Sequence, residues 1–430
     1  MSRLLIIIVF FISFPVLSQD SLSLKRAIEI GLQKNYDIQL TQKSVAINQI
    51  MNSWGEAGSL PQVNINLGQN NSISDQRNNP ISFAPYLFQS NDVSGNIALN
   101  WTIFNGFGIQ ANKNKLEQLQ IQSENTATLA IENTIHGIIL SYYQAKMQKE
   151  QLNLIFNLIQ LSKEKYDQQV LKSNLGVGVK FELLQYENNL LADSSSFYLQ
   201  ELAYRNSIRN LNLLMGSDIE KEWILSSEIK PELNDKDFNT LKSEMLANNT
   251  NIKNQFLNIS LNQQDISIAK SSFYPNINLN AGTNTSTGKL KTNDANAPFP
   301  GASSRNLNYY ANFTLNFRLF DGGKVRRAIK ALEIQNEVNQ TQLEQMQQQL
   351  ILELSNTFAL YQTRKKIFEL NKKAFIASKE NLEIARFKEK TGLINSFNFR
   401  DIEMNYLSSG VNLYQSSFDL LESNLSLIHI

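Results

Sequence analysis

The residues best suited to catalysis or metal binding are few in this sequence, and they do not cluster. The chain has no Cys, which excludes disulfides, thiolate metal sites and a lipidated N-terminal Cys. Its two His, His136 and His429, lie far apart in the sequence, and neither stands beside other metal ligands. The seven Met are scattered and form no metal relay. These residues predict neither a metal site nor a cofactor.

A Gly-Gly-Lys segment at residues 322–324 resembles part of a phosphate-binding loop. Such a loop needs Ser or Thr directly after the Lys, and a further Gly five residues before the Gly that precedes the Lys. Val325 and Arg318 occupy these two positions, so the segment does not fit. The sequence also contains no nucleophile elbow and no zinc-protease helix. It therefore predicts a protein that is not an enzyme.

Length and composition indicate a large ordered protein. The chain has 430 residues, of which 42% are hydrophobic and 18% charged, unlike a disordered polymer. Its net charge of +1 implies no nucleic-acid partner and no acidic surface as a partner.

The N-terminus has the pattern of an export signal. Arg3 precedes a short apolar run at residues 4–16, and the small residue Ser18 precedes the expected cleavage point. We therefore expect residues 1–18 to be a cleaved signal peptide. No other stretch has the pattern of a transmembrane helix, so a mature chain in a membrane would enter it as strands.

Four stretches alternate between apolar and polar residues, the pattern of a strand with two different faces. The clearest is residues 309–319, where the two sets are Ala311, Phe313, Leu315, Phe317 and Leu319 against Asn312, Thr314, Asn316 and Arg318. We expect strands at about 62–72, 93–104, 275–287 and 306–320. Residues 73–92 and 288–305 are the expected surface loops between them.

Long helices follow these strands. After residue 323 the apolar period changes from two to seven, as in a coiled-coil seam, with Leu354, Tyr361, Phe368, Phe375 and Leu382 each seven residues apart. Similar patterns cover about 107–172 and 180–215. A helix of about 65 residues would be roughly 100 Å long and needs a neighbour along its whole length. We therefore expect two antiparallel helical hairpins, with tips at 173–179 and 391–395.

The second half of the sequence repeats the first. Pro61 and Pro275 each precede an alternating strand, and they are 214 residues apart. Residues 104–106 and 320–322 match at an offset of 216. We expect a first repeat at 19–215, a linker at 216–237 and a second repeat at 238–430.

Four two-faced strands are too few to close a barrel, since bacterial membrane barrels need about eight or more, and open edges are not tolerated in lipid. Three copies of the chain would supply twelve strands. The polar set would line the bore: Asn64, Asn66, Asn100, Asn278, Asn280, Asn316 and Arg318. The apolar set, with Trp101, Phe313 and Phe317, would face lipid.

Several alternatives remain open for the strands. A soluble sandwich would pack the apolar faces inside, although it does not explain the helices several times longer than the strands. Arg318 fits an interface pairing as well as the bore. Trp101, Phe317 and Phe320 fit simple packing as well as an interfacial aromatic belt.

These features together resemble the TolC family of outer-membrane export channels. The resemblance rests on SLKRAIEIGLQKN near the start, on LPQVNINLG with its partner YPNINLNAG, and on WTIFNGF with its partner FRLFDGGKV. It implies an α+β membrane protein with duplicated coiled-coil hairpins. Three chains would form a homotrimer with a twelve-stranded β-barrel in the outer membrane, in contact with its lipid, and an α-helical tunnel in the periplasm.

The resemblance also implies a function and partners. The channel would passively conduct substrates delivered by an inner-membrane transporter and a periplasmic adaptor (membrane fusion) protein, in an efflux pump or a type I secretion system. The adaptor would dock at the tips, on Gly176, Val177, Gly178, Gly392 and Leu393. Glycine at these positions also has a purely structural reading, as a residue that ends helices. The alternative function is a non-conducting periplasmic coiled-coil spacer or adaptor.

Family channels close near the tips with rings of acidic side chains. Glu182 lies six residues after Gly176, and Asp401 nine after Gly392, so these are the gate candidates. Both also fit solvated charges on an outer helix face. The Tyr and Arg that help to lock the best-known gate are replaced here by Glu389 and Ile394, so that lock is not expected.

Overall fold

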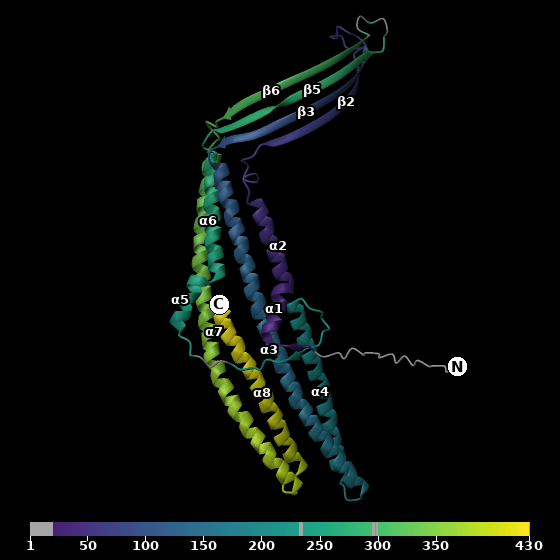
Figure 1. Ribbon diagram of the computed structural model, residues 1–430, viewed down its shortest axis with the longest axis vertical. Helices are drawn as coiled ribbons and strands as arrows, with labels where there is room; N and C mark the ends of the chain where they lie inside the picture. The colour runs from purple at the N-terminus through teal and green to yellow at the C-terminus, as the bar shows by residue number, and fades with distance from the viewer. Residues whose placement is uncertain (1–19, 232–234, 295–296, 298–299, 430) are drawn as a thin grey trace, which may run out of the picture. The chain divides into compact units, whose positions relative to one another are not determined.

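The computed structural model describes residues 20–231, 235–294, 297 and 300–429, so the predicted signal peptide lies outside the described residues (Figure 1). The chain forms the same series of elements twice. The first series is α1 (Leu24–Lys34), α2 (Tyr36–Met51), β2 (Gln62–Asp75), β3 (Leu87–Asn105), α3 (Gly108–Asn174) and α4 (Lys180–Met215). The second is α5 (Phe238–Asn248), α6 (Thr250–Ser271), β5 (Asn276–Thr292), β6 (Gly301–Asn316), α7 (Lys324–Lys390) and α8 (Ser396–His429).

The duplication extends to the helix ends. Helix α5 begins 214 residues after α1, while α7 and α8 begin 216 residues after α3 and α4. Ser23 caps α1 by accepting a hydrogen bond from the backbone N–H of Arg26, and Asp237 caps α5 in the same way from Thr240. The offsets found in the sequence are therefore those of the elements themselves.

The chain divides into two compact units. One contains residues up to 41, 127–249 and those from 348 on, and the other contains 42–126 and 250–347. The four long strands belong to the second unit, and the two tips belong to the first.

The four strands form one antiparallel sheet in the order β2-β3-β5-β6 (Figure 1). Its register places residues directly opposite one another in rows. One row joins Trp101, Leu279 and Phe313, and a row on the other face joins Asn66, Asn96, Asn284 and Asn308. We call the face with Trp101 and Phe313 the apolar face, and the face with the Asn row the amide face.

The register places those members of the predicted polar and apolar sets that lie in strands on opposite faces of the sheet. The members of the polar set that lie on the amide face are Asn64, Asn66, Asn100, Asn278, Asn280 and Asn316. On this face the Asn96 side-chain amide donates a hydrogen bond to Asn284, and the Thr102 hydroxyl donates one of 3.0 Å to Asn278.

The end predicted for the last strand was wrong. Strand β6 ends at Asn316, so Phe317, Arg318 and Phe320 lie in the connection to α7 and cannot be assigned to either face of the sheet. The final pair is Asn316 with Asn276, the residue after Pro275. Proline has no N–H for a ladder bond, so the partner strand starts only there. At the other end all four strands extend further than predicted, leaving shorter connections at 76–86 and 293–300.

The two long helical hairpins are α3 with α4 and α7 with α8, and their tips belong to the first unit (Figure 1). The predicted heptad seam is confirmed: Leu354, Tyr361, Phe368 and Leu382 are all buried. Phe375, the remaining seam residue, stacks on Tyr406 of α8 with ring centroids 5.4 Å apart. None of the helices described here is long and apolar enough to cross a membrane.

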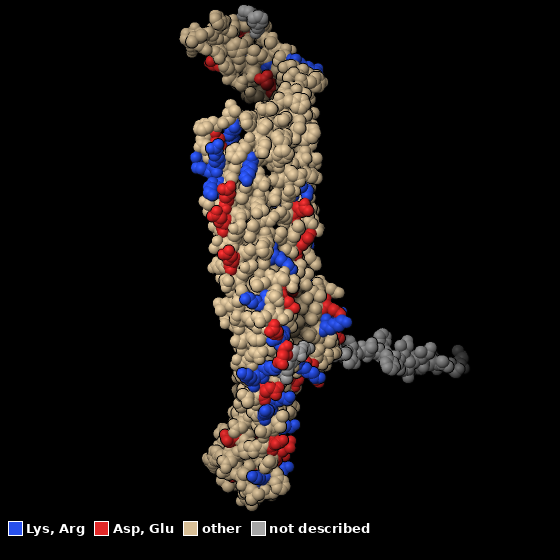
Figure 2. Space-filling model, turned by 90° about the vertical axis from the view of Figure 1, so that its left-hand side faces the viewer, with Lys and Arg blue, Asp and Glu red and all other residues tan. Residues whose placement is uncertain are grey.

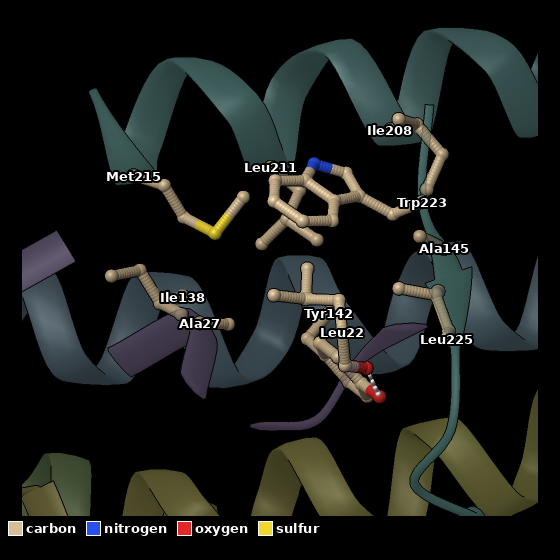
Figure 3. Close-up of a cluster of buried hydrophobic side chains, with 10 residues drawn as sticks. All are labelled: Leu22, Ala27, Ile138, Tyr142, Ala145, Ile208, Leu211, Met215, Trp223 and Leu225. Carbon is tan, nitrogen blue, oxygen red and sulfur yellow. Dashed lines mark hydrogen bonds between the residues drawn. The ribbon is translucent and has the colours of Figure 1, made fainter. Parts of the chain in front are cut away.

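Two residues of the segment predicted as a linker are part of a core. Trp223 and Leu225 pack with side chains of α3 and α4, and the whole cluster is Leu22, Ala27, Ile138, Tyr142, Ala145, Ile208, Leu211, Met215, Trp223 and Leu225 (Figure 3). The Tyr142 hydroxyl donates a 2.7 Å hydrogen bond to the carbonyl of Leu22. Two further strands of two residues each, β1 (Ser21–Leu22) and β4 (Ile224–Leu225), pair in parallel here, where no strand was predicted.

Candidate functional site at the helical tips

The two tips have the same backbone structure. Gly176 and Gly392 have φ angles of 75° and 74°, a conformation that strains residues with a side chain. At the first tip the N–H of Val177 bonds the carbonyl of Lys172, and at the second the N–H of Leu393 bonds that of Lys388. Because these bonds satisfy the last helical carbonyls, each glycine ends its helix sharply.

Apolar side chains project from both turns. Val177 is 75% exposed and Leu393 is 71% exposed, and Leu175 and Val179 are exposed beside Val177. In many turns of this type a hydrophobic contact with the preceding helix covers the apolar residue after the glycine. Here Val177 and Leu393 stay exposed instead. Directly after the tips, Phe181 of α4 and Phe397 of α8 lie with their rings 6.0 Å apart. The tips therefore combine a rigid backbone with uncovered apolar surface.

The two gate candidates have different surroundings. Glu182, in the first turn of α4, accepts a 3.0 Å hydrogen bond from the side chain of Gln169 in α3. Asp401 lies on an exposed face of α8 and accepts a long 3.4 Å bond from Asn405, one turn further along. Glu182 is thus held within its own hairpin, whereas Asp401 extends into solvent.

A buried ion pair near these candidates was missed by the sequence reasoning. Arg400 of α8 donates hydrogen bonds of 2.9 and 2.5 Å to the two carboxylate oxygens of Asp193 in α4. The Asp193 side chain is 5% exposed and that of Arg400 18%. The Ser162 hydroxyl of α3 donates a further bond of 2.5 Å to Asp193. One side chain therefore connects three helices from both hairpins.

Glu403 lies one turn after Arg400 and is buried beside it. Its Oε2 is 3.5 Å from the Arg400 guanidinium, while its Oε1 has no hydrogen-bond partner. Burial raises the pKa of Glu403 to about 7; Arg400 and Lys165 oppose the shift, and Asp193 adds to it. Glu403 can therefore change its charge near neutral pH inside the contact between the hairpins.

A second ion pair joins the hairpins through α3 and α7. The Lys165 ammonium contacts the carboxylate of Glu389, with both side chains largely buried. The same ammonium lies 5.2 Å from the ring centre of Phe399 in α8. Glu389 is the residue that replaces the Tyr of the family lock, so a different pair occupies this position. We call Lys165, Asp193, Glu389, Arg400 and Glu403 the tip cluster.

The sequence contained one signal for this cluster. Asp193 lies three residues after Leu190, on the seam side of a heptad series, where an apolar residue is expected. A charge at such a position needs a partner, but its partner is 207 residues away in the chain. On the face seen in Figure 2, positively and negatively charged side chains alternate along the helices. The distribution of exposed charges therefore does not reveal where the tip cluster lies.

The two His also meet in the structure, although nothing in their spacing predicted it. Their rings stack with centroids 4.6 Å apart, and the His429 Nε2 lies 2.9 Å from the side-chain oxygen of Asn133. Burial lowers the pKa of His136, and the charge of His429 lowers it further. The charge of Glu422 acts in the opposite direction and raises this pKa. Across the described part of the chain, no group of three potential ligands could hold a metal ion.

Comparison with known proteins supports the interpretation of this architecture. Residues 241–430 match the family described as outer membrane efflux protein. No curated protein matches the chain.

Solved structures of a membrane protein and of outer-membrane channels have a similar fold over nearly the whole chain. A membrane protein from Pseudomonas aeruginosa is 16% identical, with a TM-score of 0.73 over 94% of this chain and 92% of that one. The Campylobacter jejuni CmeC outer membrane channel is 16% identical, with a TM-score of 0.71 over 94% and 84%. The open-state Neisseria gonorrhoeae MtrE outer membrane channel is 14% identical, with a TM-score of 0.69 over 94% and 88%. The chain thus matches the outer membrane efflux protein family over residues 241–430 and shares the fold of these solved structures over nearly its whole length.

Proposed function

We propose that this chain is the protomer of a homotrimeric exit duct in the outer membrane. The duct passively conducts substrates from an inner-membrane transporter and a periplasmic adaptor to the outside. The observation that carries the proposal is the four-stranded sheet, which has one apolar and one amide face and ends in β2 and β6. Three copies joined at these edges give twelve strands with no edge left open to lipid.

In this arrangement the apolar face contacts lipid and the amide face lines a water-filled bore. The row Val63–Leu99–Ala281–Ala311 and the row of Trp101, Leu279 and Phe313 belong to the lipid contact. The aligned amides of the other face offer hydrogen bonds without charge, which suits passive conduction of varied substrates. The helices lie in the periplasm and continue the bore as a tunnel.

Exposed apolar stripes on two helices support assembly from several copies. On α4, Leu184, Leu191 and Tyr198 are exposed at intervals of seven residues. On α7, Leu360 and Ile367 are exposed at the same interval. Because a seven-residue period is the repeat of a coiled-coil seam, each stripe fits a further helix. We assign that helix to a neighbouring protomer, α4 of one copy against α7 of the next.

The tips serve as the docking site of the adaptor and as the closed end of the tunnel. Exposed Val177 and Leu393 offer apolar contacts to the adaptor's helical hairpin on a fixed backbone. The tip cluster holds the two hairpins of each protomer together, and opening requires these ion pairs to separate. Three copies of Asp401 around a narrow axis would favour cations at the constriction, with Glu182 as the second candidate.

The chain is a transport conduit and not an enzyme. The alternative of a non-conducting coiled-coil spacer is not supported, because the family and the solved structures with this fold are outer-membrane channels. Whether the partner is an efflux pump or a type I secretion system depends on the transporter, which selects the substrate.

The experiment that tests the proposal is the native mass of the detergent-solubilised mature protein from the outer-membrane fraction. A trimer is the expected result, and a stable monomer would overturn the proposal, since it would leave β2 and β6 as open edges in lipid. Leu191→Asp places a charge in the proposed helix contact and should weaken the trimer. Ser196→Asp adds the same charge to α4 away from the stripe and should leave the trimer intact.

A further inference from the structure

The apolar face of the sheet changes character near the connections between the strands. Its last wholly uncharged rows are Ile65–Ile97–Thr283–Tyr309 and Leu67–Gly95–Thr285–Leu307. The next three rows each carry one cation: Arg305 opposite Thr287, Lys289 opposite Ser303, and Lys291 opposite Gly301. We call these three residues the cationic rim.

The three cations are close together, and none of them forms an ion pair with an acidic residue in the described part of the chain. Lys289 and Lys291 are two residues apart on one strand, about 7 Å, and Arg305 and Lys289 are diagonal neighbours at about 7–8 Å. All three side chains are exposed. The long strands contain two acidic residues. Asp92 lies on the amide face. Asp75 lies on the apolar face at the end of the edge strand β2, where its carboxylate pairs with Arg77 at 2.7 Å.

The position of the rim along the strands determines what it meets. The rim lies at the end of the sheet where residues 76–86 connect β2 to β3 and residues 293–300 connect β5 to β6. Phe88 of β3 pairs with Thr292 of β5 at this same end. The opposite ends of the strands lead into the helices. If the proposed function is right, the helices lie in the periplasm, so the rim lies at the level of the outer leaflet's headgroups and the apolar rows beside it contact acyl chains.

We infer that the cationic rim binds the phosphate groups of phosphorylated lipids in the outer leaflet of the outer membrane. This inference rests on the proposed function. Arg binds a phosphate through two parallel N–H groups, and Lys acts as a compact charge, so Arg305, Lys289 and Lys291 together can hold a lipid with more than one phosphate. Such a contact also relieves the repulsion among three neighbouring cations, and it anchors the sheet at a fixed depth.

The test is lipid retention by the trimer, using bisphosphorylated lipid A as the probe. Wild-type trimers are reconstituted with a mixture of phosphatidylcholine and lipid A, returned to detergent, and their bound lipid is measured by native mass spectrometry. The variant K289Q/K291Q/R305Q should retain lipid A at least about tenfold less well, since each cation near an anionic surface contributes measurably. Retention by the wild type should also fall as the salt concentration rises.

Three controls make the result specific. The variant K163Q/K172Q/K373Q removes the same charge from exposed helical positions and should retain lipid A like the wild type. The variant K289R/K291R keeps the charge and should do the same. Dephosphorylated lipid A should be retained equally and weakly by all variants.

Equal retention of lipid A by the wild type and K289Q/K291Q/R305Q would overturn the inference, as would equal retention of the phosphorylated and dephosphorylated lipids by the wild type. A chain that fails to assemble or insert at all would instead contradict the proposed function, and with it the inference. The two failures are therefore distinguishable.

Discussion

Arg400 and Asp193 form a bidentate ion pair that connects the two helical hairpins close to their tips. The hydrogen bonds measure 2.9 and 2.5 Å, and the residues lie 207 positions apart in the chain. Because both side chains are largely buried, either one alone would be a buried charge without a partner. The pair therefore makes separation of the hairpins costly.

Replacing Arg400 alone should strongly destabilise the protein. We expect Arg400→Met to lower the free energy of unfolding by about 3–5 kcal/mol, the range for breaking a buried pair. The double variant Arg400→Met/Asp193→Leu should recover a large part of this loss, as measured by thermal unfolding in a double-mutant cycle. Arg205→Met, which breaks the more exposed pair with Glu201, should cost less than about 1 kcal/mol. Purely additive effects of the two buried substitutions would contradict the coupling.

Stability should depend on pH through Glu403. Its pKa is raised from 4.5 to about 7 in the folded chain, so the folded state holds a proton that the unfolded state releases. The resulting stability is fully present below pH 4.5 and is lost as the pH rises through about 7. Glu403→Gln should remove this dependence and stabilise the protein at pH 8 by about 1–3 kcal/mol.

The measurement for Glu403 is the unfolding temperature between pH 4.5 and 8, compared with Glu380→Gln at an exposed site of α7. The Glu380 variant should follow the wild-type pH curve. A Glu403→Gln variant with an unchanged pH curve would show that another group titrates in this range.

Charge exchange should test the link between α3 and α7. Lys165→Glu places a carboxylate against that of Glu389, and Glu389→Lys places two ammonium groups together. We expect each single variant to unfold at a lower temperature and the double exchange Lys165→Glu/Glu389→Lys to restore part of the loss. A double variant less stable than both single variants would mean that other neighbours, such as the Phe399 ring beside Lys165, dominate.

Lysine substitutions on adjacent strand positions should reveal the two faces of the sheet. Phe313→Lys puts a charge on the apolar face, at a cost of about 2–4 kcal/mol if it meets the lipid midplane. Asn312→Lys and Asn316→Lys put the same charge on the amide face and should be tolerated. Refolding into lipid vesicles measures the difference, and equal tolerance of all three variants would mean that the assignment of the faces to lipid and bore is wrong.

Much of the fold could be predicted because its patterns are long. The alternation around Phe313 and the seven-residue series through Leu354 and Tyr361 each extend over several repeats, so single exceptions do not hide them. The end of β6 could not be predicted, since Phe317 and Leu319 continue the alternation although the partner strand stops at Asn276. The pairing of β1 with β4 involves only two residues on each strand, too few for any periodicity.

The candidate site was predicted less completely. The tips could be predicted from glycine alone, because glycine readily takes the positive φ angle that ends a helix. Gly176 and Gly392 both have such a φ angle. The tip cluster depends instead on how two distant hairpins pack, and no local pattern specifies that Asp193 meets Arg400. The roles of Glu182 and Asp401 at a gate stay predictions, since they depend on the neighbouring copies.

The central claim is that three copies of this chain enclose a conducting path, and single-channel recording in planar lipid bilayers tests it most directly. We expect discrete conductance steps for the purified wild type. We also expect a higher open probability for Lys165→Met/Asp193→Asn, in which the links between the hairpins are weakened. Inserted trimers of both proteins that carry no current would contradict the account.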